Sequence, residues 1–160
     1  MNDFRQGMRQ LAGAVTVITT GRGEDVAGLT ATAVCSLTAE PPRLLACLNA
    51  GGGSFDLLRR HNRFCVNLIG APDLAIAQIF AGMGPDKTAD KFASGHWVRA
   101  EDRAPRLASA LVSFECAVHS LTLLSTHGLA IGDVLDVHLA DPSPAPLLYH
   151  DGRFAELAAS

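Results

Sequence analysis

Residues 112–139 read VSFECAVHSLTLLSTHGLAIGDVLDVHL, and the spacing of their apolar side chains decides the fold. The first part places an apolar residue at every second position, which is the period of a half-buried β-strand: Val112, Phe114, Cys116 and Val118. From Leu121 onward the apolar positions shift by one residue, so the pattern predicts a bulge or bend near His119-Ser120. A second alternating run, from Leu129 to Leu139 around Gly132, predicts another strand.

The rest of the chain shows the same preference for strands, interrupted by a few short helices. Further strands are predicted at residues 15–20, from about Val26, and at 44–48, 64–69 and 147–149. Helices are predicted over residues 3–11, from Ser54 as the N-cap to about His61, and from Pro72 to about Phe80. Residues 82–106 look like a long loop with little structure of its own. Because the strands cluster instead of alternating with helices, we expect a barrel or a sandwich of six or seven strands.

The composition is that of an ordinary globular protein. The 160 residues, 48% of them hydrophobic, suffice for a single domain spanning residues 1–160. A net charge of −3 without a basic patch gives no reason to expect nucleic acid or an anionic membrane as a partner. No apolar run approaches the ~20 residues that span a bilayer, and the amino terminus lacks the pattern of a signal peptide, so we expect a cytoplasmic protein.

Cysteine and histidine spacing points to core packing and not to a metal site. The four cysteines each lie in an apolar, strand-like segment without CxxC spacing, so we expect reduced core thiols: Cys35, Cys47, Cys65 and Cys116. The six histidines show neither HxxxH spacing nor pairing with the cysteines. We therefore expect no bound metal.

Several common catalytic motifs are absent from the sequence. No GxGxxG follows a strand, no GxxxxGK[ST] occurs, and GxSxG is missing, which excludes a Rossmann dinucleotide site, a phosphate loop of that type and the usual hydrolase elbow. No pair of carboxylates stands out for acid–base chemistry. What remains is a set of residues suited to holding a flat, phosphorylated ligand.

Residues 27–36 have the alternating character of a strand, yet almost every side chain is small. Small side chains fill little volume, so something else must lie against this segment. Either another part of the chain packs closely there, or a flat ligand does. The residues alone leave both alternatives open.

The turn at residues 49–54, Asn-Ala-Gly-Gly-Gly-Ser, leads into a predicted helix. The first backbone N–H groups of a helix have no partner within it, and the helix dipole favours an anion at that end. The turn is therefore either a phosphate site or an ordinary glycine-rich loop with a serine cap.

Taken in order, these segments resemble the flavin reductase-like family of split β-barrels, from about Phe4 to Leu157. The stretches that carry the resemblance are 4–5 with 15–20, 28–33 with 36–37, 41–44, Asn49, 63–68, 91–92 with Trp97, 115–116, His127 with 131–134, and 146–149. The resemblance implies a mainly β fold: a six- to seven-stranded antiparallel split β-barrel of Greek-key type with a few short flanking helices. It also implies a homodimer.

The resemblance assigns roles to eleven residues. Ten would contact the flavin, FMN or FAD: Thr30, Ala31, Thr32, Ala33, Ser36, Leu37, Asn49, Gly53, Ser54 and Phe92. Residues 30–33 would meet the isoalloxazine ring and ribityl chain, Asn49, Gly53 and Ser54 the phosphate end, and Phe92 the border of the pocket. His127 would position the nicotinamide of NADH or NADPH.

Two departures from the family pattern affect this site. Residues 51–53 are glycines where relatives carry hydroxyl groups, so phosphate binding must depend on backbone N–H groups, Ser54 and nearby cations. Thr126 stands where relatives often carry an acidic residue before the histidine, so the residue that would usually orient the His127 ring is missing. The alternative to a role at the nicotinamide is that His127 is a solvent-exposed turn residue.

The family resemblance implies an NAD(P)H:flavin oxidoreductase that supplies reduced flavin to a monooxygenase. Two other functions are compatible with the same fold. A fixed flavin could reduce another acceptor, such as a corrinoid or a quinone, or the barrel could bind a flavin or haem without catalysis. Steady-state oxidation of NADH with added free flavin separates the three.

Overall fold

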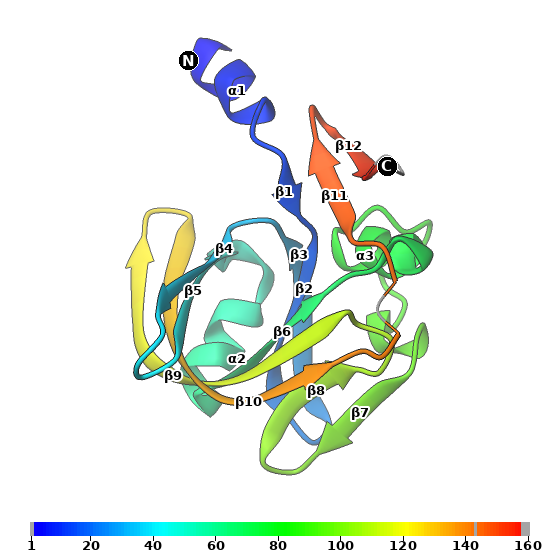
Figure 1. Cartoon of the computed structure of the whole chain (residues 1–160). Coiled ribbons are helices and arrows are strands. Elements are labelled where there is room, and N and C mark those ends of the chain that lie inside the picture. The colour runs from blue at the N-terminus through cyan, green and yellow to red at the C-terminus, as the bar shows by residue number, and fades with distance from the viewer. Residues whose placement is uncertain (1, 143, 158–160) are drawn as a thin grey trace.

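The computed structural model describes residues 2–142 and 144–157, and an antiparallel sheet of seven strands dominates it (Figure 1). The strand order is β3-β2-β6-β9-β10-β5-β4. The strands are β2 (Thr16–Arg22), β3 (Asp25–Ala31), β4 (Val34–Thr38), β5 (Arg43–Asn49), β6 (Arg63–Leu68), β9 (Val112–Leu124) and β10 (His127–Leu139). The two outermost strands, β3 and β4, follow each other in the sequence, so the sheet curls round until its ends meet at residues 32–33. This confirms the predicted split barrel.

Two smaller sheets flank the barrel. One contains β1 (Gly13–Ala14), β11 (Leu147–His150) and β12 (Arg153–Glu156), and the other pairs β7 (Trp97–Ala100) with β8 (Arg103–Leu107). The β7–β8 hairpin contradicts the prediction that residues 82–106 are loop throughout. Its outward-facing charged residues resemble a loop in composition, while Trp97 and Leu107 turn inward and are buried.

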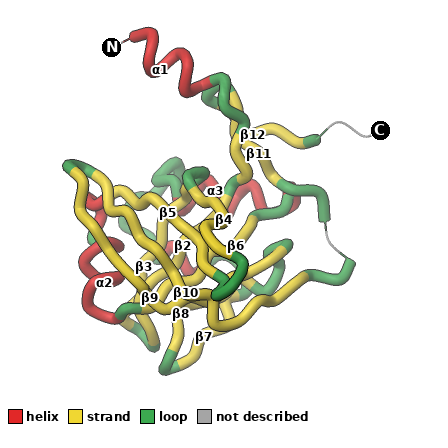
Figure 2. Tube along the Cα trace, turned by 60° about the vertical axis from the view of Figure 1, so that its left-hand side comes forward, coloured by secondary structure: helices red, strands yellow, loops and turns green. Residues whose placement is uncertain are grey.

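The described residues form three α-helices: α1 (Asn2–Arg9), α2 (Ser54–His61) and α3 (Leu74–Phe80). Single 3-10 turns occupy Ala50–Gly52, Ala71–Asp73 and Lys91–Ala93. Helices were predicted at all three α-helical positions, with ends that differ by a few residues. Helix α1 stands away from the barrel (Figures 1 and 2), and none of its described residues is buried. No helix among the described residues is long and apolar enough to cross a membrane.

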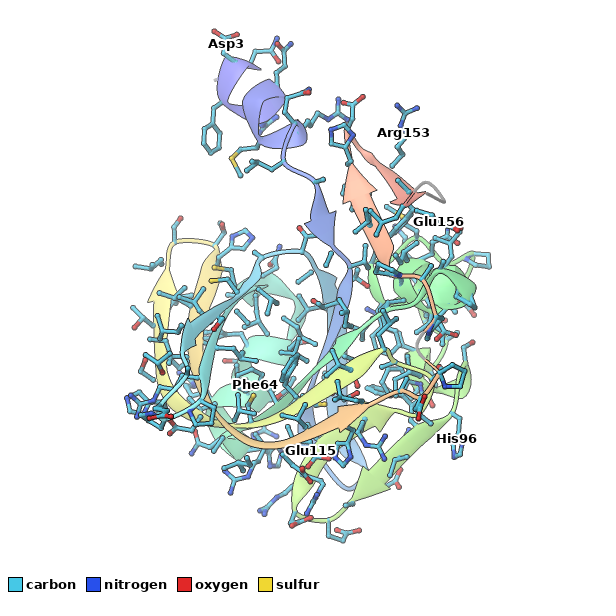
Figure 3. The ribbon with its side chains drawn as sticks, in the orientation of Figure 1. Asp3, Phe64, His96, Glu115, Arg153 and Glu156 are labelled. Carbon is cyan, nitrogen blue, oxygen red and sulfur yellow. The ribbon has the colours of Figure 1, made fainter. Side chains whose placement is uncertain are left out.

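The predicted bulge lies at His119. Strand β10 pairs Ile131 with Ser120 and then Gly132 with Val118, so His119 is the extra residue of β9. Beside it, Gly132 leaves room for the ring of Phe64, which is 1% exposed and points into the barrel (Figure 3). A Cβ atom at Gly132 would overlap this ring. The absence of a side chain at Gly132, in the middle of the predicted alternation, is thus explained by the packing of the Phe64 ring.

The apolar residues form two cores, one on each side of the sheet around β2. The first fills the barrel and includes Ile18, Leu48, Leu58, Phe64 and Val66. The second lies between the sheet, α3 and β8 and includes Val17, Ile76, Phe80, Trp97 and Leu107. Since consecutive residues of β2 belong to different cores, this strand is buried on both faces.

Asn67 of β6 is a buried polar residue that joins three other strands. Its side-chain Nδ2 donates to the carbonyl of Val17, 3.0 Å away. Its Oδ1 accepts from the backbone N–H of Leu107 at 2.8 Å and from the hydroxyl of Ser113 at 2.9 Å. Every partner is a strong donor or acceptor, so removing the amide leaves several buried groups unpaired.

The four cysteines are free and lie in strands, as predicted. Cys65 and Cys116 are buried, and burial raises the pKa of the Cys116 thiol to about 12, which keeps it protonated. The prediction of a core thiol is wrong for Cys35, which is exposed because β4 is the edge strand of the main sheet. Cys47 is partly buried.

We expect Asn67→Ala to lower the free energy of unfolding by about 2–4 kcal/mol, because it leaves partners on three strands unpaired. Urea unfolding followed by circular dichroism measures this. Ser113→Ala is the matched control, since it removes one of the same hydrogen bonds and should cost about 1 kcal/mol. Equal losses in the two variants would contradict a central role for Asn67.

Candidate functional site

A hollow of about 360 Å³ lies where the turn after β5 meets β3 and the start of α2. Its lining includes Gly28, Asn49, Gly51, Gly52, Ser54 and Lys91. We call this hollow the phosphate cradle. It brings together four residues of the predicted turn, a strand residue and a lysine that is distant in the sequence.

Two local features shape the turn of the cradle. The Asn49 side chain accepts a hydrogen bond from the Gly51 N–H at 2.8 Å and caps the 3-10 turn Ala50–Gly52. Gly53 then takes φ +79°, a backbone conformation that favours glycine, and the chain enters α2. A Cβ atom at Gly52 would meet no atom within 4 Å, so the turn is open on the side of the cradle.

Ser54 is not the N-cap that the sequence predicts. Gly53 holds the N-cap position and has no side chain that could accept a hydrogen bond from the helix. Ser54 is the first residue of the helix and is 4% exposed. Glycine replaces serine as the cap because the turn needs a left-handed residue there. As a result, no side chain among the described residues caps the first N–H groups of α2. A helix start of this kind favours an anion.

The start of α2 is fixed by packing against β10. The ring of Phe55 fills the space beside Gly128, where a Cβ atom would overlap it. Phe55 and Leu58 are buried, so the helix start is anchored by its apolar face and not by a cap. This packing holds the N-terminal end of the helix toward the cradle.

Lys91 is the cation of the cradle, and sequence reasoning gave it no role. Its Nζ lies 3.4 Å from the carbonyl oxygen of Phe80 and 5.8 Å from the centroid of the Phe80 ring. Asp90 fixes the backbone before it by accepting from the Phe92 N–H at 2.9 Å. Lys91 makes no ion pair within the part of the chain that the structure describes. The available signal was the Lys91-Phe92 stretch, which was noted only as part of the family pattern.

Phe92 packs with two other aromatic rings. Its centroid lies 5.1 Å from those of Phe80 and Trp97, both in edge-to-face contact. Phe92 is partly buried and holds the Lys91 turn against the second core. Its predicted place at the border of the flavin pocket stays a prediction.

The small residues of β3 serve two purposes. At Gly28 a Cβ atom would come within 2.7 Å of the Phe80 ring, and the Thr30 hydroxyl donates to the Ala77 carbonyl at 2.7 Å, so α3 packs closely here. Thr30, Ala31 and Thr32 also line a second hollow of about 250 Å³ together with Met83 and Tyr149. Close protein packing explains Gly28, and open space remains beside residues 30–32.

The structure separates the remaining predicted contacts from the cradle. Ala33 lies in the bend before β4, where its carbonyl accepts from the Cys47 N–H at 2.9 Å. Ser36 and Leu37 are exposed on β4, and Ser36 lines a groove of about 430 Å³ with Val34, Phe114 and Val137. These three positions remain predicted flavin contacts on another part of the surface.

His127 lies directly beside the phosphate cradle. It is the first residue of β10 and pairs with Asn49 of β5, and the preceding carbonyl of Thr126 accepts from the Ala50 N–H at 2.9 Å. The ring is exposed, and its Nδ1 lies 2.8 Å from the Thr126 hydroxyl. The Thr126 hydroxyl therefore provides the contact to the His127 ring that an acidic residue would otherwise provide.

The strand order is that of an antiparallel split barrel, and a hollow lies at the turn between β5 and α2. These features place the protein in the class of split β-barrels. The chain belongs to the flavin reductase-like family, because the family model described as "Flavin reductase like domain" matches residues 8–158.

Individual relatives agree with this assignment over nearly the whole chain. The FMN reductase (NADH) RutF of Variovorax paradoxus is 36% identical over 157 residues, covering 98% of this chain and 86% of that protein. Among solved structures, the NADH:FAD oxidoreductase SgcE6 of Streptomyces globisporus is 29% identical with a TM-score of 0.86, covering 98% and 92% of the two chains. The styrene monooxygenase flavin reductase of Pseudomonas putida S12 is 27% identical with a TM-score of 0.82 and 98% of each chain covered.

We expect the protein to bind FMN more tightly than riboflavin, by roughly 1–3 kcal/mol, because the N–H groups and Lys91 of the cradle would hold the FMN phosphate. Lys91→Gln should reduce most of this preference by removing the cation. Fluorescence titration with both flavins measures it, and Arg22→Gln, an exposed arginine at the end of β2 outside the cradle, is the control. Equal affinities of the wild type for FMN and riboflavin would refute the phosphate role.

Proposed function

We propose that this chain is a flavin reductase that oxidises NADH and reduces FMN or FAD. The observation that carries the proposal is the phosphate cradle, where Lys91, the turn amides and the start of α2 converge within a flavin reductase-like fold. Its named relatives support the same activity: RutF is an FMN reductase that uses NADH, and SgcE6 is an NADH:FAD oxidoreductase.

The residues of the site fit a flavin phosphate. A phosphate needs several N–H donors and a cation. The cradle offers the first N–H groups of α2 and Lys91, which forms no ion pair with any residue that the structure describes. Glycines at 51 and 52 allow close approach to the backbone. When bound, the flavin and the nicotinamide supply the hydride-transfer chemistry, so the protein needs neither a nucleophile nor a strong base.

The protein residues would therefore bind and orient. The β3 segment at residues 30–32 offers a small-residue surface beside open space, where a flat ring could lie. His127, whose ring is exposed beside Asn49, would hold the nicotinamide by donating a hydrogen bond to its carboxamide or to a phosphate. The Thr126 hydroxyl, 2.8 Å from Nδ1, would orient the ring for this.

We further propose that the reduced flavin leaves the protein for a monooxygenase and that the reaction takes place in the cytoplasm. The support for such a partner is the likeness to the flavin reductase of styrene monooxygenase. A Cβ atom at Gly52 or Gly53 would meet no described atom within 4 Å, and such an open cradle is compatible with a flavin that exchanges with solution.

The working form would be a homodimer. Large apolar side chains of β9 and β10 are exposed in the single chain: Leu123, Leu124, Leu135, Val137 and Leu139. Val137 also lines the groove along β4 with Phe114 and Val134. An exposed apolar surface of this kind marks a protein interface, and a second copy of the same chain would cover it by two-fold symmetry.

Steady-state oxidation of NADH with added FMN or FAD tests the activity. We expect a rate that saturates with free flavin. A rate that needs a further acceptor but no free flavin would favour the fixed-flavin alternative. If NADH is not oxidised with either flavin, the proposed function is wrong.

We expect His127→Ala to raise the KM for NADH by roughly tenfold, about 1.4 kcal/mol, and to leave flavin affinity nearly unchanged. The reason is that its ring would position the nicotinamide and would not transfer a proton. Kinetics with varied NADH and flavin titration measure the two effects. A loss of flavin affinity with unchanged NADH kinetics would place His127 on the flavin side of the site.

Sedimentation equilibrium should give about twice the chain mass of 16.8 kDa. Val137→Glu should shift the population toward single chains, because it would place a charge in the apolar contact. A fully active wild-type protein that sediments as a single chain would contradict the homodimer.

A further inference from the structure

Helix α1 presents an apolar side that no described part of the chain covers. Phe4, Met8 and Leu11 follow one another at intervals of four and three residues, so their side chains lie on one face of the helix. They are 71%, 51% and 64% exposed. The helical turn continues to Leu11, whose N–H donates to the Met8 carbonyl at 3.3 Å. We call these three side chains the apolar stripe of α1.

The direction of α1 is fixed at its C-terminal end. The carbonyl of Arg9 accepts a hydrogen bond from the Asp151 N–H at 2.9 Å. The Arg9 guanidinium also lies against Gly152, where a Cβ atom would come within 2.7 Å of Nη2. Residues 151–152 form the turn between β11 and β12, so these contacts hold the helix to that hairpin. The helix therefore points away from its own barrel, with Asp3 at its outer end (Figures 1 and 3).

A helix as short as α1 needs packing from outside. It has eight residues, and helices shorter than about 12 residues are marginal in water. Gly7 in its middle destabilises it further. Such helices are stabilised in proteins by burial of an apolar face, yet no described residue of α1 is buried. The surface of another molecule would supply this packing.

The groove along β4 is an uncovered apolar surface on the same chain. It encloses about 430 Å³, and every residue that lines it belongs to β4, β5, β9, β10 or the loop between β4 and β5. Its apolar lining is Val34, Leu44, Phe114, Val134 and Val137. Val137 is also one of the exposed side chains of the proposed homodimer contact, so the groove continues that surface.

The free charges beside the two surfaces have opposite signs. Arg5 is exposed on α1 next to the apolar stripe, and Glu40 is exposed in the β4–β5 loop at the edge of the groove. Neither forms an ion pair within residues 2–142 and 144–157. The arginine that lines the groove, Arg43, is already paired with Asp133 at 2.6 Å. A helix in the groove would therefore bring Arg5 near a carboxylate that has no other cation.

We propose that α1 of one chain packs into the β4 groove of a second copy, which returns the same contact. Phe4, Met8 and Leu11 would cover the apolar lining, and Arg5 would lie near the partner's Glu40. A two-fold axis relates the two chains, so each contact occurs twice. The inference rests on the homodimer of the proposed function and names the segment that joins its two chains. It depends on neither flavin nor NADH.

Sedimentation equilibrium of Phe4→Asp tests the apolar stripe. We expect the dissociation constant of the dimer to rise at least about tenfold, because a charge would enter the apolar groove. Gln6→Asp is the matched control, since it adds the same charge on the opposite side of α1 and should leave the constant unchanged. Both side chains are exposed in the single chain, so neither variant should disturb its fold. If Phe4→Asp dimerises as tightly as Gln6→Asp, the proposal is wrong.

A disulfide cross-link locates the helix directly. Cys35 is exposed and lines the groove, so Met8→Cys would bring a second thiol to it in the dimer. Diamide takes two electrons and two protons from the thiol pair, and the S–S bond that forms joins the two chains. On a denaturing gel we expect a reducible dimer for Met8→Cys, but not for Gln6→Cys or for Met8→Cys combined with Cys35→Ser. A Met8→Cys protein that links no more than Gln6→Cys would overturn the proposal.

The same preparations separate failure of this contact from failure of the proposed function. A wild type that sediments as a single chain would remove both the homodimer and the helix contact. A dimer that keeps its affinity in Phe4→Asp would remove the helix contact alone. Oxidation of NADH with free flavin, measured on each sample, reports on the proposed activity independently of both.

Discussion

The side chain of Asn67 connects the barrel to the β7–β8 hairpin that lies outside it. Through Leu107 it fixes β8 on the sheet, and β8 carries β7 with Trp97 at the start of the hairpin. Trp97 packs with Phe80 and Phe92, and Phe92 lies next to Lys91. The cation of the phosphate cradle is therefore positioned, in four steps, by one buried amide. Such a polar group is stabilising only if every partner is present, which makes the register of β8 specific.

Helix α3 packs closely against β3. Gly28 admits the Phe80 ring, and Thr30 binds the carbonyl of Ala77, so the helix lies close enough for its C-terminal end to reach the hollow beside residues 30–32. The small side chains that looked like a ligand surface in the sequence are partly the condition for this close packing. Close packing and an open hollow are thus provided by neighbouring residues of one segment.

Much of the fold could be predicted from periodicity, because apolar alternation reports directly on pairing and burial. The bulge at His119 could be predicted because the apolar positions shift by one residue there. The starts of two helices could be predicted from Pro72 and from the turn at residues 49–54. The β7–β8 hairpin was missed because its composition is charged, and only tertiary contacts of Trp97 and Leu107 reveal it. The sequence offers both Gly53 and Ser54 as the N-cap of α2, and the prediction chose the serine. Gly53 is the N-cap because the turn requires a left-handed backbone conformation at that residue.

The site was predictable only in part, since a cradle is made by segments distant in sequence. Asn49 and Ser54 could be found locally, but the approach of Lys91 depends on the aromatic cluster and on α3. The glycines of the turn have a kinetic consequence. Because residues 51–53 carry no hydroxyl groups, fewer hydrogen bonds would have to break when a bound flavin departs. Differences in binding affinity between related complexes are mostly differences in dissociation rate, so a faster dissociation of flavin is expected. The open space beside Gly52 then marks the position at which a single added hydroxyl, as in Gly52→Ser, would slow the departure of a flavin bound there.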